Sequence, residues 1–158
     1  MAFKVVSIPT LLAEEARRTR LAPSFGHPVQ ASVASASGYG PCRHCLRRTQ
    51  VGERRLLLNY NPYPEPDQVS VVGPIFIHEE PCEAFVGEGF PGELRGLPMR
   101  LQGHLRDGSG IVNRFLDSQF PEAAIENLFH DPEIGFIALR NEEAGCFIAR
   151  IERAQETP

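Results

Sequence analysis

The sequence lacks an excess of basic charge: 16 lysine and arginine residues stand against 20 aspartate and glutamate residues, and the net charge is −4 at pH 7. Proteins that bind nucleic acids take much of their affinity from basic groups that neutralise phosphates. The charge balance therefore argues against a nucleic-acid partner. We interpret the one N-terminal basic group, Arg17, Arg18 and Arg20, as solvated surface side chains.

Long apolar runs are also missing. No stretch approaches the roughly 18 apolar residues of a membrane-spanning helix, and the segment after Met1 does not resemble a secretory signal peptide. We therefore expect a cytoplasmic protein without a membrane partner. Because the cytoplasm keeps thiols reduced, the four cysteines indicate free thiols, metal ligands or a redox pair, and not a disulfide framework.

Several catalytic and cofactor-binding motifs do not occur. The sequence has no Gly-rich phosphate loop, no Gly-x-Ser-x-Gly elbow, no His-Glu-x-x-His and no dinucleotide fingerprint. It has no evident internal repeat either. No cofactor is predicted from these motifs, and zinc is the one metal for which the sequence offers ligands.

Apolar residues are present in the proportion that a packed core needs. Of the 158 residues 42% are hydrophobic, and ten are Phe. A chain of this length buries roughly 70% of the surface that it exposes when unfolded. We expect a single globular domain over residues 1–158, with a loop-rich segment over residues 22–40, where Pro, Ser, Ala and Gly dominate.

The apolar pattern predicts many strands and few helices. Strands are expected over residues 3–8, 29–33, 54–60, 69–78, 99–105, 111–115, 134–140 and 146–153, and helices over residues 9–20 and 122–130. Three prolines in residues 61–67 predict a stiff exposed loop. Because the helices are too few for repeated β–α–β units, the expected fold class is α+β, with a mainly antiparallel sheet and about two helices.

Thiols and imidazoles are concentrated in two short segments, each beside a predicted strand. Cys42 and Cys45 form a Cys-x-x-Cys pair in the first, and His78 and Cys82 form a His-x-x-x-Cys pair in the second. Thiolate and imidazole are the ligands that tetrahedral zinc prefers. If the fold brings the segments together, these four residues predict a zinc-stabilised interaction module without a catalytic role.

The same segments also permit cysteine chemistry. The Cys42 thiol, beside Arg43, has the surroundings that stabilise a thiolate, and His44 or His78 is placed in sequence to act as its base. A thioredoxin-like redox site is disfavoured, because a Ser- and Gly-rich stretch precedes Cys42 where such a site has a strand. Cys146, between Gly145 and Phe147, is most simply a core residue.

A small-molecule site is the other interpretation of these segments. Arg43 has the planar fork that binds a carboxylate or phosphate, Glu79 follows His78 directly, and Tyr63 stands in the proline-rich loop. These residues predict a pocket for a small polar or anionic molecule, with room for cysteine-based chemistry, and this is the interpretation that we prefer from the sequence. The zinc-stabilised interaction module is the alternative. The sequence leaves open whether such a protein is an enzyme, and it does not predict an oligomeric state.

Four short segments carry a resemblance to a known family. They are Pro41-Cys42-Arg43, Gly52-Glu53 before Leu56-Leu57-Leu58, Gly73 to His78, and Gly145-Cys146-Phe147 with Ile151-Glu152-Arg153. Together they resemble the bacterial DUF1203 family, whose members are about this long. The resemblance implies a bacterial, single-domain protein and supplies no activity or mechanism.

Overall fold

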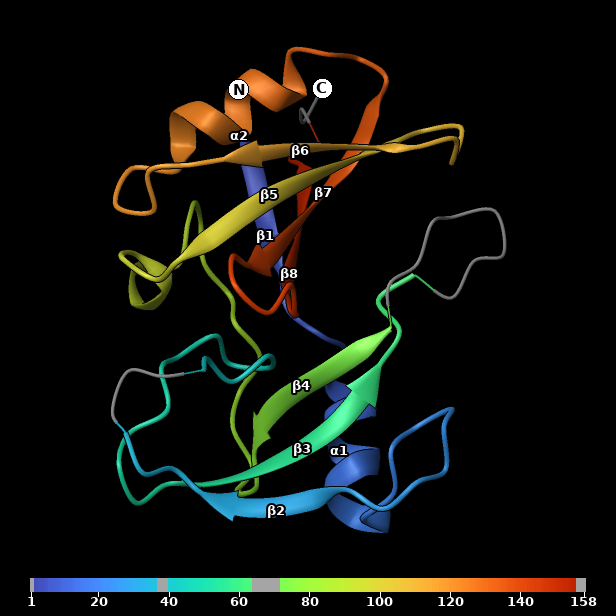
Figure 1. The fold of residues 1–158 in the computed structure, drawn as a ribbon, viewed down its shortest axis with the longest axis vertical. Coiled ribbons are helices and arrows are strands. Elements are labelled where there is room, and N and C mark those ends of the chain that lie inside the picture. The colour runs from blue at the N-terminus through green and yellow to red at the C-terminus, as the bar shows by residue number, and fades with distance from the viewer. Residues whose placement is uncertain (1, 37–39, 64–71, 156–158) are drawn as a thin grey trace.

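Two antiparallel sheets and two α-helices form the fold of the described residues, 2–36, 40–63 and 72–155, in the computed structural model of the protein (Figure 1). The predicted α+β class is confirmed. Within these residues, no helix has the length and apolar character needed to cross a membrane.

The larger sheet has five strands in the order β1-β8-β7-β5-β6. Their bounds are β1 Phe3–Val6, β5 Met99–Leu105, β6 Ile111–Phe115, β7 Ile134–Asn141 and β8 Phe147–Arg153. The helix α2 (Glu122–Phe129) packs on this sheet, because its apolar side chains Ile125, Leu128 and Phe129 are buried in the same cluster as sheet residues. A short 3₁₀ turn, η1 (Gly92–Leu94), precedes β5 and adds the buried Leu94 to this core.

The smaller sheet has three strands in the order β2-β3-β4. Their bounds are β2 Gln30–Val33, β3 Arg54–Tyr60 and β4 Gly73–His78. The helix α1 (Thr10–Thr19) joins this half of the molecule through Ala13 and Ala16, which are buried in one cluster with Leu56 of β3 and Ile77 of β4.

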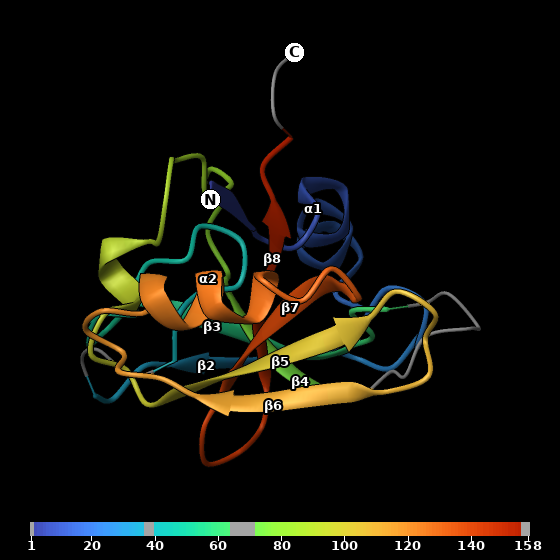
Figure 2. The same cartoon turned by 90° about the horizontal axis from the view of Figure 1, so that it is seen from above.

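The strand β7 supplies both cores, because successive side chains of a strand point to opposite faces. Ile137 and Leu139 belong to the cluster under α2, whereas Phe136 and Ala138 belong to the cluster shared with the three-stranded sheet. The five-stranded sheet is therefore the middle layer, between α2 on one side and the smaller sheet with α1 on the other (Figures 1 and 2).

The predicted strands and helices all occur, with small shifts at their ends. The strand predicted over residues 69–78 begins at Gly73, and its residues 69–71 lie outside the described part, as do residues 64–67 of the proline-rich loop. The prediction that this loop is exposed is wrong for Tyr63, whose side chain is 1% exposed. Its ring packs against Phe136, with 4.8 Å between ring centroids, and belongs to the cluster shared with the smaller sheet.

Candidate metal centre

The first segment of the site is a tight turn over residues 41–48, which we name the cysteine turn. Its first and last residues pair as an antiparallel bridge. Within it, the Cys42 amide donates to the Arg47 carbonyl at 2.9 Å, and the Leu46 amide donates to the Cys42 carbonyl at 2.8 Å. The backbone can reverse this sharply because Leu46 adopts a left-handed conformation, with φ of 58°. The turn thereby directs Cys42 and Cys45 to one place.

The second segment is the end of β4 and the four residues after it. His78 is the last residue of β4. Cys82 follows in an irregular stretch, after a bend at Glu79 and Glu80. Main-chain contacts fix the cysteine turn to this strand, because the Arg43 amide donates to the Phe76 carbonyl at 3.0 Å. The His78 amide in turn donates to the Cys42 sulfur at 3.3 Å.

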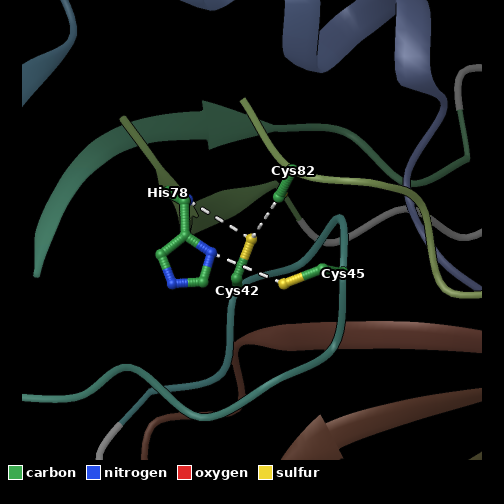
Figure 3. Close-up of side chains that lie close together, drawn as sticks. All are labelled: Cys42, Cys45, His78 and Cys82. Carbon is green, nitrogen blue, oxygen red and sulfur yellow. Dashed lines mark hydrogen bonds between the residues drawn. The ribbon is translucent and has the colours of Figure 1, made fainter. Parts of the chain in front are cut away.

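Four side chains from these segments converge (Figure 3). One ligand atom from each of Cys42, Cys45, His78 and Cys82 lies within 4.8 Å of the others. The Cys42 and Cys82 sulfur atoms are 3.9 Å apart, and the Cys45 sulfur is 3.4 Å from His78 Nδ1. Three of the four residues are buried, and Cys82 is half-buried. Three thiols and one imidazole thus surround a space of the size that a metal ion takes.

Hydrogen bonds among these four side chains shift their pKa values. Hydrogen bonds from the side chains of Cys45 and Cys82 hold the pKa of the Cys42 thiol well below its ordinary range. The same contacts raise the pKa of Cys82, since it donates to its neighbours. Hydrogen bonds to Cys42 and Cys45 raise the pKa of His78 to about 10. The cluster therefore stabilises negative charge on sulfur. A bound cation would stabilise the same charge.

A carboxylate lies behind the histidine. Glu53 Oε2 is 2.9 Å from His78 Nε2, a close ion-pair contact rather than an aligned hydrogen bond. Because Nε2 is turned to Glu53, the other ring nitrogen, Nδ1, faces the sulfur atoms. A carboxylate on the outer nitrogen fixes the ring orientation of metal-binding histidines and raises their basicity. Glu53 is therefore placed to orient His78 as a ligand.

Cationic side chains surround the thiols from outside. Arg17 of α1 donates through Nη2 to the Cys82 sulfur at 3.1 Å and through Nε to the His78 carbonyl at 3.0 Å. Arg47 hydrogen-bonds the Cys45 sulfur, and this contact raises the arginine pKa. Three thiolates and a divalent cation leave one negative charge, so these guanidinium groups balance the charge of an occupied site.

A comparison with protein-family models matches residues 39–153 to DUF1203, described as a protein of unknown function. The chain belongs to the DUF1203 family. The matched region contains all four cluster residues and Glu53, whereas Arg17 precedes it. No curated protein and no solved structure matches this chain.

The residue set matches a closed zinc site better than an open one. In this DUF1203 protein, three thiols and one imidazole supply four protein ligands, which is the number that fills a tetrahedral structural zinc site. Catalytic zinc sites usually have three protein ligands and keep the fourth position for water or substrate. The described cluster has no such free position if all four residues bind one ion.

The residues predicted to be catalytic are only partly brought together. Cys42 and His78 are in the cluster, whereas His44 lies beside it and is buried. His44 Nδ1 is 3.3 Å from the Cys82 sulfur, and Nε2 is 2.9 Å from the Thr10 hydroxyl. Burial, and then the charge of Arg17, lower the pKa of His44. His44 therefore contacts the half-buried ligand from outside and is itself held by α1.

The residues predicted to bind a small molecule have other partners. Arg43 is buried and donates to the main-chain carbonyls of Phe147 and Pro41, each at 2.7 Å. Its pKa falls to about 10 because of this burial. Its planar fork is thus used to fasten the cysteine turn to β8, and it is not directed at solvent.

Glu79 and Tyr63 are also used within the protein. Glu79 pairs with Arg20 at 2.7 Å and with Arg54, so it ties α1 to the start of β3. Tyr63 packs against the His104 ring at 4.6 Å between centroids, on the face of the five-stranded sheet. Neither side chain is among the four that converge on the metal centre.

Two residues outside the predicted set support the site. The prediction that Arg17 is a solvated surface side chain is wrong, because Arg17 hydrogen-bonds both a ligand sulfur and the carbonyl of a ligand residue. Glu53 contacts His78 because β3 and β4 pair with Arg55 opposite His78, which puts the residue before β3 near the end of β4. Both contacts depend on tertiary placement, so no local pattern reveals them.

A second turn in the chain has the same backbone pattern. Residues 21–28, which we name the front turn, are also closed by an antiparallel bridge between their first and last residues. The Ala22 amide donates to the His27 carbonyl at 2.8 Å, and the Gly26 amide donates to the Ala22 carbonyl at 2.8 Å. Gly26 has the left-handed conformation, with φ of 78°. Ala22 and Phe25 occupy the positions at which the cysteine turn carries its two thiols.

Proposed function

We propose that this protein binds one zinc ion through Cys42, Cys45, His78 and Cys82 and acts as a zinc-stabilised, non-catalytic module. The observation that supports the proposal is the convergence of the four ligand atoms within 4.8 Å. Zinc is favoured over harder ions because thiolate and imidazole are soft or borderline ligands, whereas magnesium and calcium prefer oxygen.

The surroundings of the cluster support a structural role for the ion. Glu53 behind His78 and Arg17 beside Cys82 are the kind of outer contacts that hold ligands in place. The ion would join the cysteine turn to the end of β4, two segments that are far apart in sequence. We further propose a cytoplasmic location in a bacterium, because the family resemblance implies a bacterial protein and because reduced cysteines suit the cytoplasm.

Elemental analysis tests the proposal directly. Full-length protein, purified without chelator, is expected to contain about one zinc per chain, and its cobalt-substituted form is expected to show the sulfur-to-cobalt charge-transfer bands of thiolate ligation. Cys146→Ser is the control, because Cys146 is not among the converging residues. A wild-type protein that stays metal-free after incubation with zinc under reducing conditions contradicts the proposal.

Binding of a small anion beside the cluster is a second candidate function. It is favoured by a groove of about 680 Å³ beside Cys82. The charged residues that line it are four arginines, Arg17, Arg18, Arg20 and Arg54, and three glutamates, Glu14, Glu79 and Glu80. Two of these arginines are already paired with Glu79, which lowers the net charge of the groove. Metal-free protein with one fast-reacting thiol, protected by phosphate or a carboxylate, would favour this function over the zinc module.

A further inference from the structure

The three thiols of the metal centre differ in their access to solvent. Cys42 and Cys45 are 1% and 7% exposed, whereas Cys82 is half-buried. Cys82 also lines two grooves, one along α1 and one beside the loop before β3. A solute that approaches the cluster through either groove therefore meets the Cys82 sulfur before the other two.

The contacts of Cys82 place a cation and a second thiol beside its sulfur. The Arg17 guanidinium donates to this sulfur at 3.1 Å, and the Cys42 sulfur is 3.9 Å away. A thiol that binds a metal is deprotonated, and exposed thiolates with a second thiol nearby are the cysteines that oxidants reach first. Cys82 has both features, because it is the least buried thiol of the cluster and lies beside Cys42.

We propose that Cys82 is an oxidation site, and that its reaction with a hydroperoxide releases the metal. This inference rests on the proposed zinc site. In the first step, the Cys82 thiolate attacks one oxygen of hydrogen peroxide, the O–O bond breaks, and the products are the sulfenic acid of Cys82 and hydroxide. In the second step, the Cys42 thiolate attacks the sulfenic sulfur, an S–S bond forms, and a second hydroxide leaves. Two thiolates are oxidised to a disulfide, and one peroxide is reduced.

The disulfide would remove two of the four metal ligands. The two sulfur atoms must approach from 3.9 Å to the roughly 2 Å of an S–S bond. Cys45 and His78 then remain, and two ligands hold zinc far more weakly than four. The disulfide also keeps the cysteine turn attached to the segment after β4, so the reaction exchanges one link between these segments for another.

The test uses full-length, zinc-loaded protein. Metal content is measured first, hydrogen peroxide is then added with a chromophoric chelator present, and the cysteine-containing peptides are mapped by mass spectrometry. We expect zinc release at a rate proportional to peroxide, one Cys42–Cys82 disulfide per chain, and rebinding of zinc after reduction with dithiothreitol. Iodoacetamide is expected to label Cys82 before Cys42 and Cys45 in the zinc-loaded protein.

Two variants sharpen the result. Cys82→His keeps a fourth ligand and removes the accessible thiol, so peroxide should release its zinc at least roughly tenfold more slowly. Cys146→Ser should behave as wild type, because its thiol lies outside the cluster. Labelling order in the wild-type protein decides the matter if Cys82→His does not bind zinc.

Contrary outcomes separate the two proposals. Zinc that is retained while Cys146 is oxidised, or released with only a Cys42–Cys45 disulfide, would overturn the oxidation site and leave the zinc site standing. Protein that holds no zinc before peroxide is added would overturn both.

Discussion

The cysteine turn and the front turn share a hydrogen-bonding pattern and differ in side chains and at one backbone position, where Ser24 is left-handed and His44 is not. Each has the same bridge, the same pair of internal hydrogen bonds and a left-handed residue at the same position. One places Cys42 and Cys45 beside His78 and Cys82, whereas the other places Ala22 and Phe25 at the matching positions. Because the front turn closes without any thiol, the shape of such a turn does not depend on a metal.

The difference shows where the metal would act. In the cysteine turn the hydrogen bonds already close the loop, so an ion adds a connection from the turn to β4 and not the turn itself. Loss of the ion should therefore loosen the contact between residues 41–48 and residues 78–82, while the front turn stays as it is. Each of the following changes tests one part of this comparison.

The largest effect is expected from matched substitutions at the second cysteine of the thiol pair and at its counterpart in the front turn. Cys45→Ser removes a metal ligand and should lower the free energy of unfolding by roughly 5 kcal/mol or more, since structural zinc contributes on the order of 10 kcal/mol. Phe25→Ser, at the matching position of the front turn, should cost less than about 1 kcal/mol because Phe25 is an exposed side chain. Chemical denaturation with and without chelator measures both.

Hydrogen exchange gives the same comparison by region. Chelator treatment of wild-type protein should accelerate exchange in residues 41–48 and around residue 82, and leave residues 21–28 unchanged. Equal acceleration in both turns would show that the metal supports the whole smaller sheet and not only the contact between the cysteine turn and β4.

The next effect concerns the left-handed residue of the cysteine turn. Leu46 is 1% exposed and packs in the core of the five-stranded sheet, so its side chain anchors the turn in a way that Gly26 cannot. Leu46→Ala should cost about 2–5 kcal/mol through the cavity that it leaves. Thermal denaturation of the zinc-loaded protein measures this loss, and an effect below about 1 kcal/mol would mean that the ion alone holds the turn in place.

A smaller effect is expected behind the histidine ligand. Glu53→Gln replaces the carboxylate beside His78 and should weaken zinc binding by about 10- to 100-fold, because the ring loses its charged partner. Competition with a chromophoric chelator measures the affinity. Glu80→Gln, in the same groove, is the matched control and should bind zinc as wild type does. Equal effects of the two variants would indicate a general loss of negative charge.

The smallest effect is expected in the front turn itself. Gly26→Ala should lower the free energy of unfolding by about 1 kcal/mol, because a left-handed conformation strains any residue with a Cβ. The added Cβ would have no atom within 4 Å, so the cost is one of backbone conformation. Gly92→Ala also meets open space but has no positive φ, and it should be close to neutral.

Much of the fold can be predicted from the sequence, because it depends on local patterns. The apolar runs Leu56-Leu57-Leu58 in β3 and Phe136 to Leu139 in β7 identify strands without knowledge of their neighbours. The sequence predicts a zinc site only on the condition that the two ligand segments meet, since no local pattern shows whether they do. The roles of Arg17 and Glu53 cannot be predicted from the sequence for the same reason. They arise from the docking of α1 and the register of β3 with β4.

Tyr63 shows the opposite failure. Its proline-rich surroundings predict an exposed loop, yet the ring is buried in the core cluster that the five-stranded sheet shares with the smaller sheet. Local stiffness is readable in the sequence, whereas the surface against which a stiff segment lies is not.

The position of the cysteine turn has a consequence for assembly. The strand β4 is an edge of the smaller sheet, and two of its outward main-chain groups are taken by the turn: the Phe76 carbonyl by the Arg43 amide, and the His78 amide by the Cys42 sulfur. An open edge strand is a template for pairing with another chain. The turn therefore shields this edge, and a chain whose turn has come away would present β4 to its neighbours and tend to aggregate.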